Sequence, residues 1–164
     1  MSICFNNEGY DQTNTSKSLL KALRVSHESG VLWLNGAVVF DKSVLERVTD
    51  RIKNEKSFVY VNTAAVGEEE VKYTVNESGN IYALSKQVQN ALGEAVGINF
   101  ISNKDKSHLI EQLDDCADND YFERGIELAI EKYGIAIDPV DISDLFAVEV
   151  DFQADLDRAN SKFN

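Results

Sequence analysis

One stretch of the sequence limits the possible folds more than any other, an apolar run that stops at a turn. Residues 31–34 are Val-Leu-Trp-Leu, side chains that suit a strand covered on both faces. Asn35-Gly36 follow at once and permit the backbone angles of a sharp turn, and Asp41 can cap the next helix. In an open α/β sheet, ligands bind outside the carboxyl ends of the strands. Ala37, in that loop, offers no ligand, acid or base.

Strand-like runs alternate with amphipathic helical runs along the whole chain, which predicts an α/β domain. Strands are expected at 2–6, 31–35, 58–62, 94–102, 135–137 and 145–150, and helices at 15–27, 42–52, 109–117, 121–133 and 153–163. The helix at 15–27 is expected to be capped by Thr15 or Ser16. Residues 70–84 predict an antiparallel hairpin beside the sheet. The sequence therefore predicts a single domain, 1–164, with three α/β/α layers and a mixed, mostly parallel sheet.

Charge and cysteine content narrow the classes of function. The chain has 28 acidic and 16 basic residues, a net charge of −12, which opposes binding to nucleic acid and to anionic membranes. Cys4 and Cys116 lie far apart, without clustered histidines, so no zinc site is expected. The sequence shows neither a secretory leader nor an apolar run of membrane-spanning length, which predicts a cytoplasmic protein. The negative net charge does not exclude a small phosphate ligand that carries Mg²⁺, because such a ligand is recognised by a local site rather than by the average charge of the protein.

Four stretches of sequence carry information through their order and spacing. They are 6–19, with Tyr10, Thr13-Asn14 and Ser18-Leu19; 34–41; 69–98, with Glu69 to Lys72, Ser85-Lys86 and Gly93 to Ile98; and 148–156. Together they resemble nucleotidyltransferases of the sugar-phosphate and phosphocholine cytidylyltransferase type, and most of all the variant associated with phosphonate metabolism. The resemblance implies a Rossmann-like fold with an inserted β-hairpin. It also implies a reaction in which a phosphate or phosphonate oxygen attacks the α-phosphorus of a nucleotide and pyrophosphate leaves.

The resemblance implies a weakened metal site. In the family, an Asn-Gly-Asp strand end and a Glu-x-Asp segment each supply one carboxylate to Mg²⁺. Here Ala37 stands at the first position, and Asp151 matches the second. Asp151 would then hold Mg²⁺ alone and weakly. The other interpretation of Asp151 is a cap for the helix at 153–163.

The resemblance also implies a set of substrate-binding residues, although it assigns no catalytic residue. Asn35 belongs to the strand end, Lys72 and Lys86 to the hairpin, and Glu94 to the strand that follows. Lysine side chains on a hairpin more often lie in solvent on the protein surface. The alternative interpretation of Lys72 and of Lys86 is therefore that neither binds a substrate. Glu94 lies between two glycines, and glycines in a strand can mark the close approach of a ligand.

The largest departure from the family lies at the beginning of the chain. Family members start with a strand and a glycine-rich loop, carrying Arg and Lys, that holds the nucleotide triphosphate. The sequence has no such loop, and Met1 stands where a family member is already partway through its sheet. The resemblance therefore implies a truncated protein with little or no turnover on its own, unless a complementing chain supplies the missing half. The alternative is a noncatalytic binding module. Such a module could form a homodimer in which exposed sheet edges of two copies pair.

Overall fold

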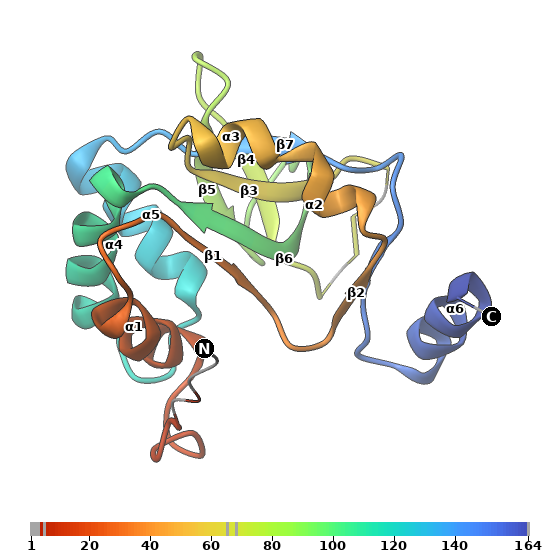
Figure 1. Ribbon diagram of the computed structural model, residues 1–164, viewed down its shortest axis with the longest axis horizontal. Coiled ribbons are helices and arrows are strands. Elements are labelled where there is room, and N and C mark those ends of the chain that lie inside the picture. The colour runs from red at the N-terminus through yellow and green to blue at the C-terminus, as the bar shows by residue number, and fades with distance from the viewer. Residues whose placement is uncertain (1–3, 5, 65, 68, 164) are drawn as a thin grey trace.

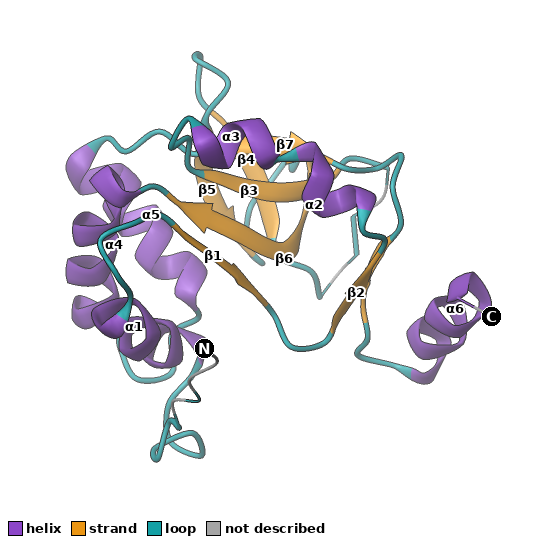
Figure 2. Cartoon of the chain, in the orientation of Figure 1, coloured by secondary structure: helices purple, strands orange, loops and turns teal. Residues whose placement is uncertain are grey.

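The computed structural model describes residues 4, 6–64, 66–67 and 69–163, and three layers make up its architecture (Figure 1). One layer contains α1 (Thr15–Val25), α4 (Asn103–Asp115) and α5 (Phe122–Tyr133). The layer across the sheet contains the short helices α2 (Ser43–Arg47) and α3 (Thr49–Lys53), and α6 (Gln153–Phe163) closes the described chain. Figure 2 shows the central strands between α2 and α3 on one side and α1, α4 and α5 on the other, with α6 standing apart. The three-layer α/β/α prediction is confirmed.

The central sheet has six strands in the order β5-β4-β6-β3-β7, with β1 added on β6. The strands are β1 (Val31–Leu34), β3 (Phe58–Asn62), β4 (Lys72–Val75), β5 (Ile81–Ser85), β6 (Gly93–Ile101) and β7 (Asp138–Asp141). A separate ladder joins β2 (Val38–Phe40) to β8 (Ala147–Glu149). The sheet is mixed as expected, but within the described chain only β3 and β7 run parallel. The expectation of a mostly parallel sheet was wrong, because β4, β5 and β6 follow one another through short connections, which favour antiparallel neighbours.

The hairpin of β4 and β5 belongs to the main sheet rather than lying beside it. Lys72 of β4 pairs with Glu94 of β6, and Tyr73 pairs with Gly93. Tyr73, Ile81 and Leu84 are buried in the core beneath α5. Burial of these side chains explains why the hairpin extends the sheet.

Two hydrophobic cores lie on opposite faces of the sheet. Consecutive side chains of a strand point to opposite faces, and β3 shows this directly. Val59 and Val61 pack in the core under α1, α4 and α5, whereas Phe58 and Tyr60 pack in the core under α2. The apolar residues of β3 are therefore buried on both sides of the sheet.

Several helix ends differ from expectation. Asn14, rather than Thr15 or Ser16, caps α1, because its Oδ1 accepts from the Thr15 backbone N–H at 2.8 Å. Residues 42–52 form two helices that meet at Val48 instead of one, although Asp41 does accept from the Ser43 backbone N–H. α4 begins at Asn103, earlier than expected, whereas Gly134 ends α5 in the left-handed conformation, with φ of 64°.

The strand expected at 135–137 lies three residues later, at β7. Ile135 and Ile137 are buried as an irregular segment, and the carbonyl of Ile137 accepts from the Ile81 backbone N–H. β7 contains Pro139, which an edge strand tolerates because one side of it needs no ladder hydrogen bonds. The strand expected at 2–6 lies mostly outside the described residues, and Cys4 and Asn6 belong to neither helix nor strand.

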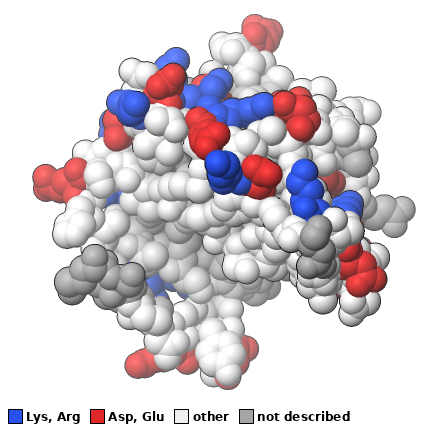
Figure 3. Space-filling view, turned by 45° about the vertical axis from the view of Figure 1, so that its right-hand side comes forward, with Lys and Arg blue, Asp and Glu red and all other residues white. Residues whose placement is uncertain are grey.

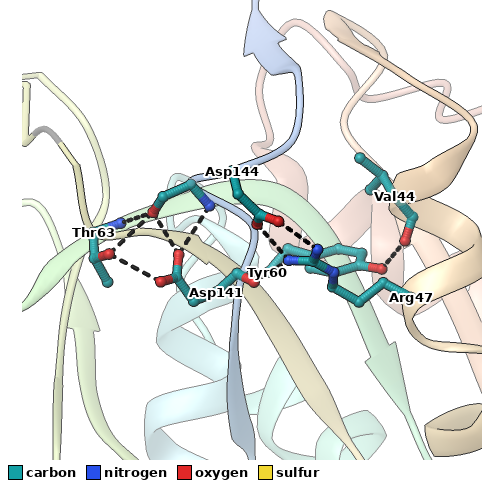
Figure 4. A network of polar contacts seen from close by, with 7 residues as sticks. Val44, Arg47, Tyr60, Thr63, Asp141 and Asp144 are labelled. Carbon is teal, nitrogen blue, oxygen red and sulfur yellow. Dashed lines mark hydrogen bonds and ion pairs between the residues drawn. The ribbon is translucent and has the colours of Figure 1, made fainter.

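A polar network fixes α2 to the sheet (Figure 4). The hydroxyl of Tyr60, in β3, donates to the backbone carbonyl of Val44. Arg47 of α2 pairs with Asp144 at 2.7 Å between Nη2 and Oδ2, and Thr63 Oγ1 donates to Asp141 at 3.0 Å. Burial raises the pKa of Tyr60 to about 12, so the phenol stays protonated as a donor.

Candidate functional site

A pocket of about 540 Å³ opens at the carboxyl end of β1, and we call it the β1 pocket. Segments distant in the sequence line it: Trp33 to Ala37, Glu69 to Val71, Lys86, Tyr121 to Glu123, and Glu149 with Asp151, together with Thr15, Ser18 and Leu19 of α1. The turn after β1 therefore lies where sheets of this kind bind ligands.

Two motifs distant in the sequence meet in this pocket. The backbone N–H of Val150 donates to the carbonyl of Ala37 at 3.0 Å. Beside it, the side-chain amide of Asn35 donates to Glu149 Oε1 at 3.1 Å. These bonds hold the turn after β1 against the segment that ends in Asp151, so Ala37 and Asp151, the two positions expected from the sequence to correspond to metal ligands, line one pocket.

Gly97 makes this junction possible. Its φ is +71°, and an added Cβ would lie 2.8 Å from the side-chain nitrogen of Asn35. Gly93 is equally confined, because a Cβ there would lie 2.3 Å from the carbonyl oxygen of Asn62. The interpretation of these glycines as marks of a ligand's approach is wrong, since atoms of the chain itself occupy the space.

The structure brings together four of the six residues singled out from the sequence. Asn35, Ala37, Lys86 and Asp151 all line the β1 pocket. Lys86 Nζ lies 3.8 Å from Glu69 Oε2 and 5.8 Å from the centroid of the Tyr121 ring.

Lys72 and Glu94 lie outside the lining of the β1 pocket. Lys72 Nζ donates to the backbone carbonyl of Lys86 at 3.3 Å. Glu94 lines a neighbouring cavity of about 250 Å³, and its Oε2 accepts from the Gly67 backbone N–H at 2.9 Å. Glu94 thus holds the loop after β3, and Lys72 supports the chain that carries Lys86.

Four carboxylates of the pocket were missed from the sequence, namely Glu69, Glu70, Glu123 and Glu149. Glu123 is only 8% exposed, and burial raises its pKa to about 7. Burial also raises the pKa of Glu70 and of Glu149, and the charge of Asp151 adds to both shifts. A signal for Glu123 existed, because it occupies a buried face of α5 that otherwise carries apolar residues.

Aromatic side chains form the apolar part of the pocket wall. The rings of Trp33 and Phe122 meet edge to face, with centroids 5.7 Å apart. Tyr121, half exposed, stands beside them under Lys86. The pocket thus combines an aromatic wall with several carboxylates and one lysine among its described lining residues.

The protein donors do not form a complete metal site. The described residues contain no group of three or more His, Cys, Asp or Glu side chains arranged to hold a metal ion. Ala37 contributes no side-chain oxygen, and at the start of α6 it is Asp155, not Asp151, that accepts from the Phe152 backbone N–H. Mg²⁺ commonly takes one or two protein carboxylates together with phosphate oxygens of the substrate. Asp151 could therefore hold Mg²⁺ only together with oxygens of a ligand.

No protein-family model matches the sequence, and no curated protein matches it significantly. Solved structures do match the fold. The inositol-1-phosphate CTP transferase from T. maritima is 15% identical, with a TM-score of 0.76 over 95% of this chain and 64% of that one. A putative glucose-1-phosphate thymidylyltransferase from Bacillus anthracis is 11% identical, with a TM-score of 0.74 over 98% of this chain and 64% of that one.

The CTP:phosphocholine cytidylyltransferase from Streptococcus pneumoniae is 12% identical, with a TM-score of 0.67 over 96% of this chain and 67% of that one. The chain thus spans somewhat less than two thirds of the first two structures. Within the described residues, no helix has the length and apolarity that crossing a membrane requires. At these identities the likeness concerns architecture, and the chain has the fold of the sugar-phosphate and phosphocholine nucleotidyltransferases.

Proposed function

We propose that the β1 pocket binds a small phosphorylated or phosphonylated molecule, the acceptor of a nucleotidyl transfer, and that the chain alone transfers little or no nucleotide. The observation that carries the proposal is the shared pocket of Ala37, Asp151 and Lys86. It supports a binding site of the nucleotidyltransferase kind in which one of two acidic ligands has been replaced by a methyl group.

The charge of the pocket shapes what it can bind. Lys86 is the one cation among its described lining residues, against several carboxylates. A phosphate dianion beside Asp151 needs a counter-ion, and Mg²⁺ bound by Asp151 and the ligand's own oxygens would neutralise that charge. Binding should therefore depend on Mg²⁺ and be weak.

The structural neighbours support the choice of candidate acceptors. The printed names of the structural neighbours include enzymes for inositol 1-phosphate, glucose 1-phosphate and phosphocholine. Sugar phosphates, phosphocholine and phosphonates are accordingly our candidate acceptors, with a nucleotide such as CTP as the second substrate if a complementing chain binds it. A phosphonate-associated role and a cytoplasmic location remain parts of the proposal that rest on the sequence.

Nucleic acid is not a proposed partner. On the face shown in Figure 3, Lys and Arg lie next to Asp and Glu rather than forming a basic patch. The net charge of −12 opposes binding of the chain to a polyanion.

Calorimetric titration tests the proposal. The full chain is titrated with glucose 1-phosphate, phosphocholine, 2-aminoethylphosphonate and CTP, each with and without Mg²⁺. We expect Mg²⁺-dependent binding of at least one acceptor, and we expect Asp151→Asn and Lys86→Met to weaken it. Asp115→Asn and Lys104→Met are the matched controls, because both residues are exposed and lie outside the pocket lining.

The titrations decide whether the β1 pocket binds a phosphorylated acceptor. If no acceptor binds, or if the control variants weaken binding as much as the pocket variants do, the proposed function is wrong. Nucleotide transfer by the chain alone, measured as pyrophosphate release, would overturn the second half of the proposal.

A noncatalytic interaction module is the second candidate, and the free edge of β1 favours it. In the described chain β1 pairs with β6 alone, and Figure 1 shows β1 at the border of the sheet. β1 is wholly apolar, whereas the edge strand β7 carries Pro139 and two aspartates that oppose pairing. Light scattering over a concentration series tests a homodimer formed through β1, and a strictly monomeric chain would exclude it.

A further inference from the structure

Helix α6 presents apolar side chains to solvent instead of burying them. The exposed fraction is 70% for Phe152, 42% for Leu156 and 55% for Phe163, whereas no other helix of the described chain carries more than one exposed large apolar residue. Ala159 is the one buried residue among those described in α6. In Figure 1 the helix stands apart from the sheet and its layers. A helix normally turns its apolar side chains towards a core, so α6 has an apolar surface that its own chain leaves largely uncovered.

These apolar side chains form one stripe along the helix, which we call the α6 stripe. Its members follow one another at intervals of four, three and four positions, namely Phe152, Leu156, Ala159 and Phe163. This is the spacing with which helices pack side by side in coiled coils. Phe152 begins the stripe although it precedes α6, because its carbonyl accepts a helical hydrogen bond from the Leu156 backbone N–H at 3.2 Å. At the other end, the ring of Phe163 meets its own chain only edge to face, at Phe146, with centroids 5.6 Å apart. The α6 stripe therefore has the pattern of a seam for a second helix.

The residues that flank the α6 stripe indicate the direction of that second helix. Asp155 and Lys162 lie seven positions apart on one flank, with the acidic residue near the beginning of the helix and the basic residue near its end. The uncharged Gln153 and Asn160, also seven positions apart, lie on the other flank. When two identical helices pair antiparallel, equivalent flanks meet in reverse order. Asp155 of each copy then approaches Lys162 of the other, whereas parallel pairing would bring like charges together.

The interactions that Asp155 and Lys162 make within the chain are weak. Asp155 Oδ1 lies 3.7 Å from Nη2 of Arg158, whose side chain is 62% exposed, and exposed ion pairs contribute little to stability. The other carboxylate oxygen of Asp155 accepts from the Phe152 backbone N–H at 3.1 Å. Lys162 Nζ lies 5.7 Å from the centroid of the Phe146 ring. A lysine from a second copy can therefore approach Asp155 without breaking a strong interaction.

We infer that the α6 stripe binds the α6 stripe of a second copy of this chain, with the two helices antiparallel. The occupant is a second copy because one two-fold axis pairs the stripe with itself and brings Asp155 to Lys162 at both ends. Phe152 of each copy then lies beside Phe163 of the other. Because the 11 residues of α6 span only about 16 Å, the helix pair is smaller than a standard interface and the dimer is weak. This interface differs from the free edge of β1 and does not depend on the proposed function.

Sedimentation equilibrium of the full chain tests the interface. From about 10 μM to about 1 mM, we expect the weight-average mass to rise from that of the monomer towards that of the dimer. Leu156→Gln places an amide in the middle of the α6 stripe and should raise the dissociation constant at least about tenfold, equivalent to about 1.4 kcal/mol. Leu92→Gln is the matched control, because Leu92 is 49% exposed and lies outside α6. Circular dichroism establishes that each variant is folded.

Charge reversal tests the antiparallel direction. Asp155→Lys makes both ends of the charged flank basic, and Lys162→Asp makes both ends acidic. Each variant alone should dimerise more weakly than the wild type, because like charges then meet across the helix pair. An equimolar mixture of the two variants should form a heterodimer that is tighter than either homodimer, and high salt should reduce this gain. Damage to the fold of α6 in one variant would not be repaired by mixing.

Three results would overturn the inference. The first is a wild-type chain that stays monomeric over the whole concentration range. The second is equal weakening by Leu156→Gln and Leu92→Gln, or a mixture of the charge variants that associates no more tightly than each variant alone. The third is a dimer that survives Leu156→Gln but is lost in Leu34→Lys, which would place the interface at the edge of β1.

Discussion

The backbone N–H of Val150 donates to the carbonyl oxygen of Ala37 at 3.0 Å, although 112 residues separate the two positions. This bond places the turn after β1 directly beside the segment that ends in Asp151. A side chain introduced at position 37 would therefore enter the pocket that Asp151 lines.

Ala37→Asp should increase Mg²⁺ affinity. A second carboxylate in the same pocket supplies a hard oxygen ligand that the wild type lacks, and we expect an increase of about tenfold or more, equivalent to about 1.4 kcal/mol. Calorimetric titration with Mg²⁺ measures the change. Ala37→Asn has the same shape without the charge and is the matched control. An equal gain in Ala37→Asn, or a gain that persists in the double variant with Asp151→Asn, would show that the new ligand does not act together with Asp151.

Glu123 should make stability depend on pH. Its pKa rises from the ordinary 4.5 to about 7 on folding, so the folded chain binds its proton more tightly than the unfolded chain does. The stability that this residue contributes is fully present below pH 4.5 and is lost as the pH rises through 7. Relative to Glu123→Gln, the wild type should lose on the order of 3 kcal/mol between pH 4.5 and pH 8.

Urea unfolding of both proteins across this range measures the difference between them. Comparison with Glu123→Gln removes the contributions of the other carboxylates, whose titrations are common to both chains. Glu131→Gln should follow the wild-type curve. A constant difference between wild type and Glu123→Gln at all pH values would contradict the prediction.

Gly97→Ala should destabilise the chain and loosen the pocket. The position has φ of +71°, and a Cβ would lie 2.8 Å from Asn35 Nδ2, which bonds Glu149. We expect a loss of about 1–3 kcal/mol from backbone strain and displacement of Asn35. Gly36→Ala is the control, because nothing lies within 4 Å of a Cβ there. Denaturant unfolding checks both, and equal effects would show that the packing at Gly97 is unimportant.

Tyr60→Phe should cost about 1 kcal/mol of stability, since the Val44 carbonyl loses its buried donor. Tyr82→Phe serves for comparison, because Tyr82 is 66% exposed. Thermal unfolding measures both variants, and we expect a lower unfolding midpoint than that of the wild type for Tyr60→Phe but not for Tyr82→Phe. A Tyr60→Phe midpoint equal to that of the wild type would mean that the hydroxyl does not anchor α2.

Local patterns in the sequence predicted the elements better than they predicted the sheet. Residues 58–62 form the expected strand as a short apolar run that is buried on both faces, and residues 153–163 form the expected helix although Ala159 is its one buried residue among those described. Strand direction depends on which segments pair across long distances, and residue periodicity carries no information about that. The predictions of a mostly parallel sheet and of a hairpin lying beside that sheet were therefore wrong.

The same limit applies to the pocket. Asn35, Ala37 and Asp151 follow strand ends, and strand ends gather at one edge of a sheet, so their meeting was predictable. Glu70 and Glu149 lacked a signal, because only the fold shows that these half-buried side chains line one pocket. Lys72 and Glu94 were predicted at the site but face other parts of the chain, since alternation along a strand does not reveal which cavity lies on each side.

Strand β6 has a consequence for folding. It pairs with β1, β3 and β4, and through them it organises the three segments that carry Asn35, Glu70 and Lys86 to the pocket. Opening β6 would separate these residues at once, so the pocket exists only while the whole sheet is intact. A bound ligand should therefore slow amide hydrogen exchange across β6 and its neighbours, far beyond the residues that it touches.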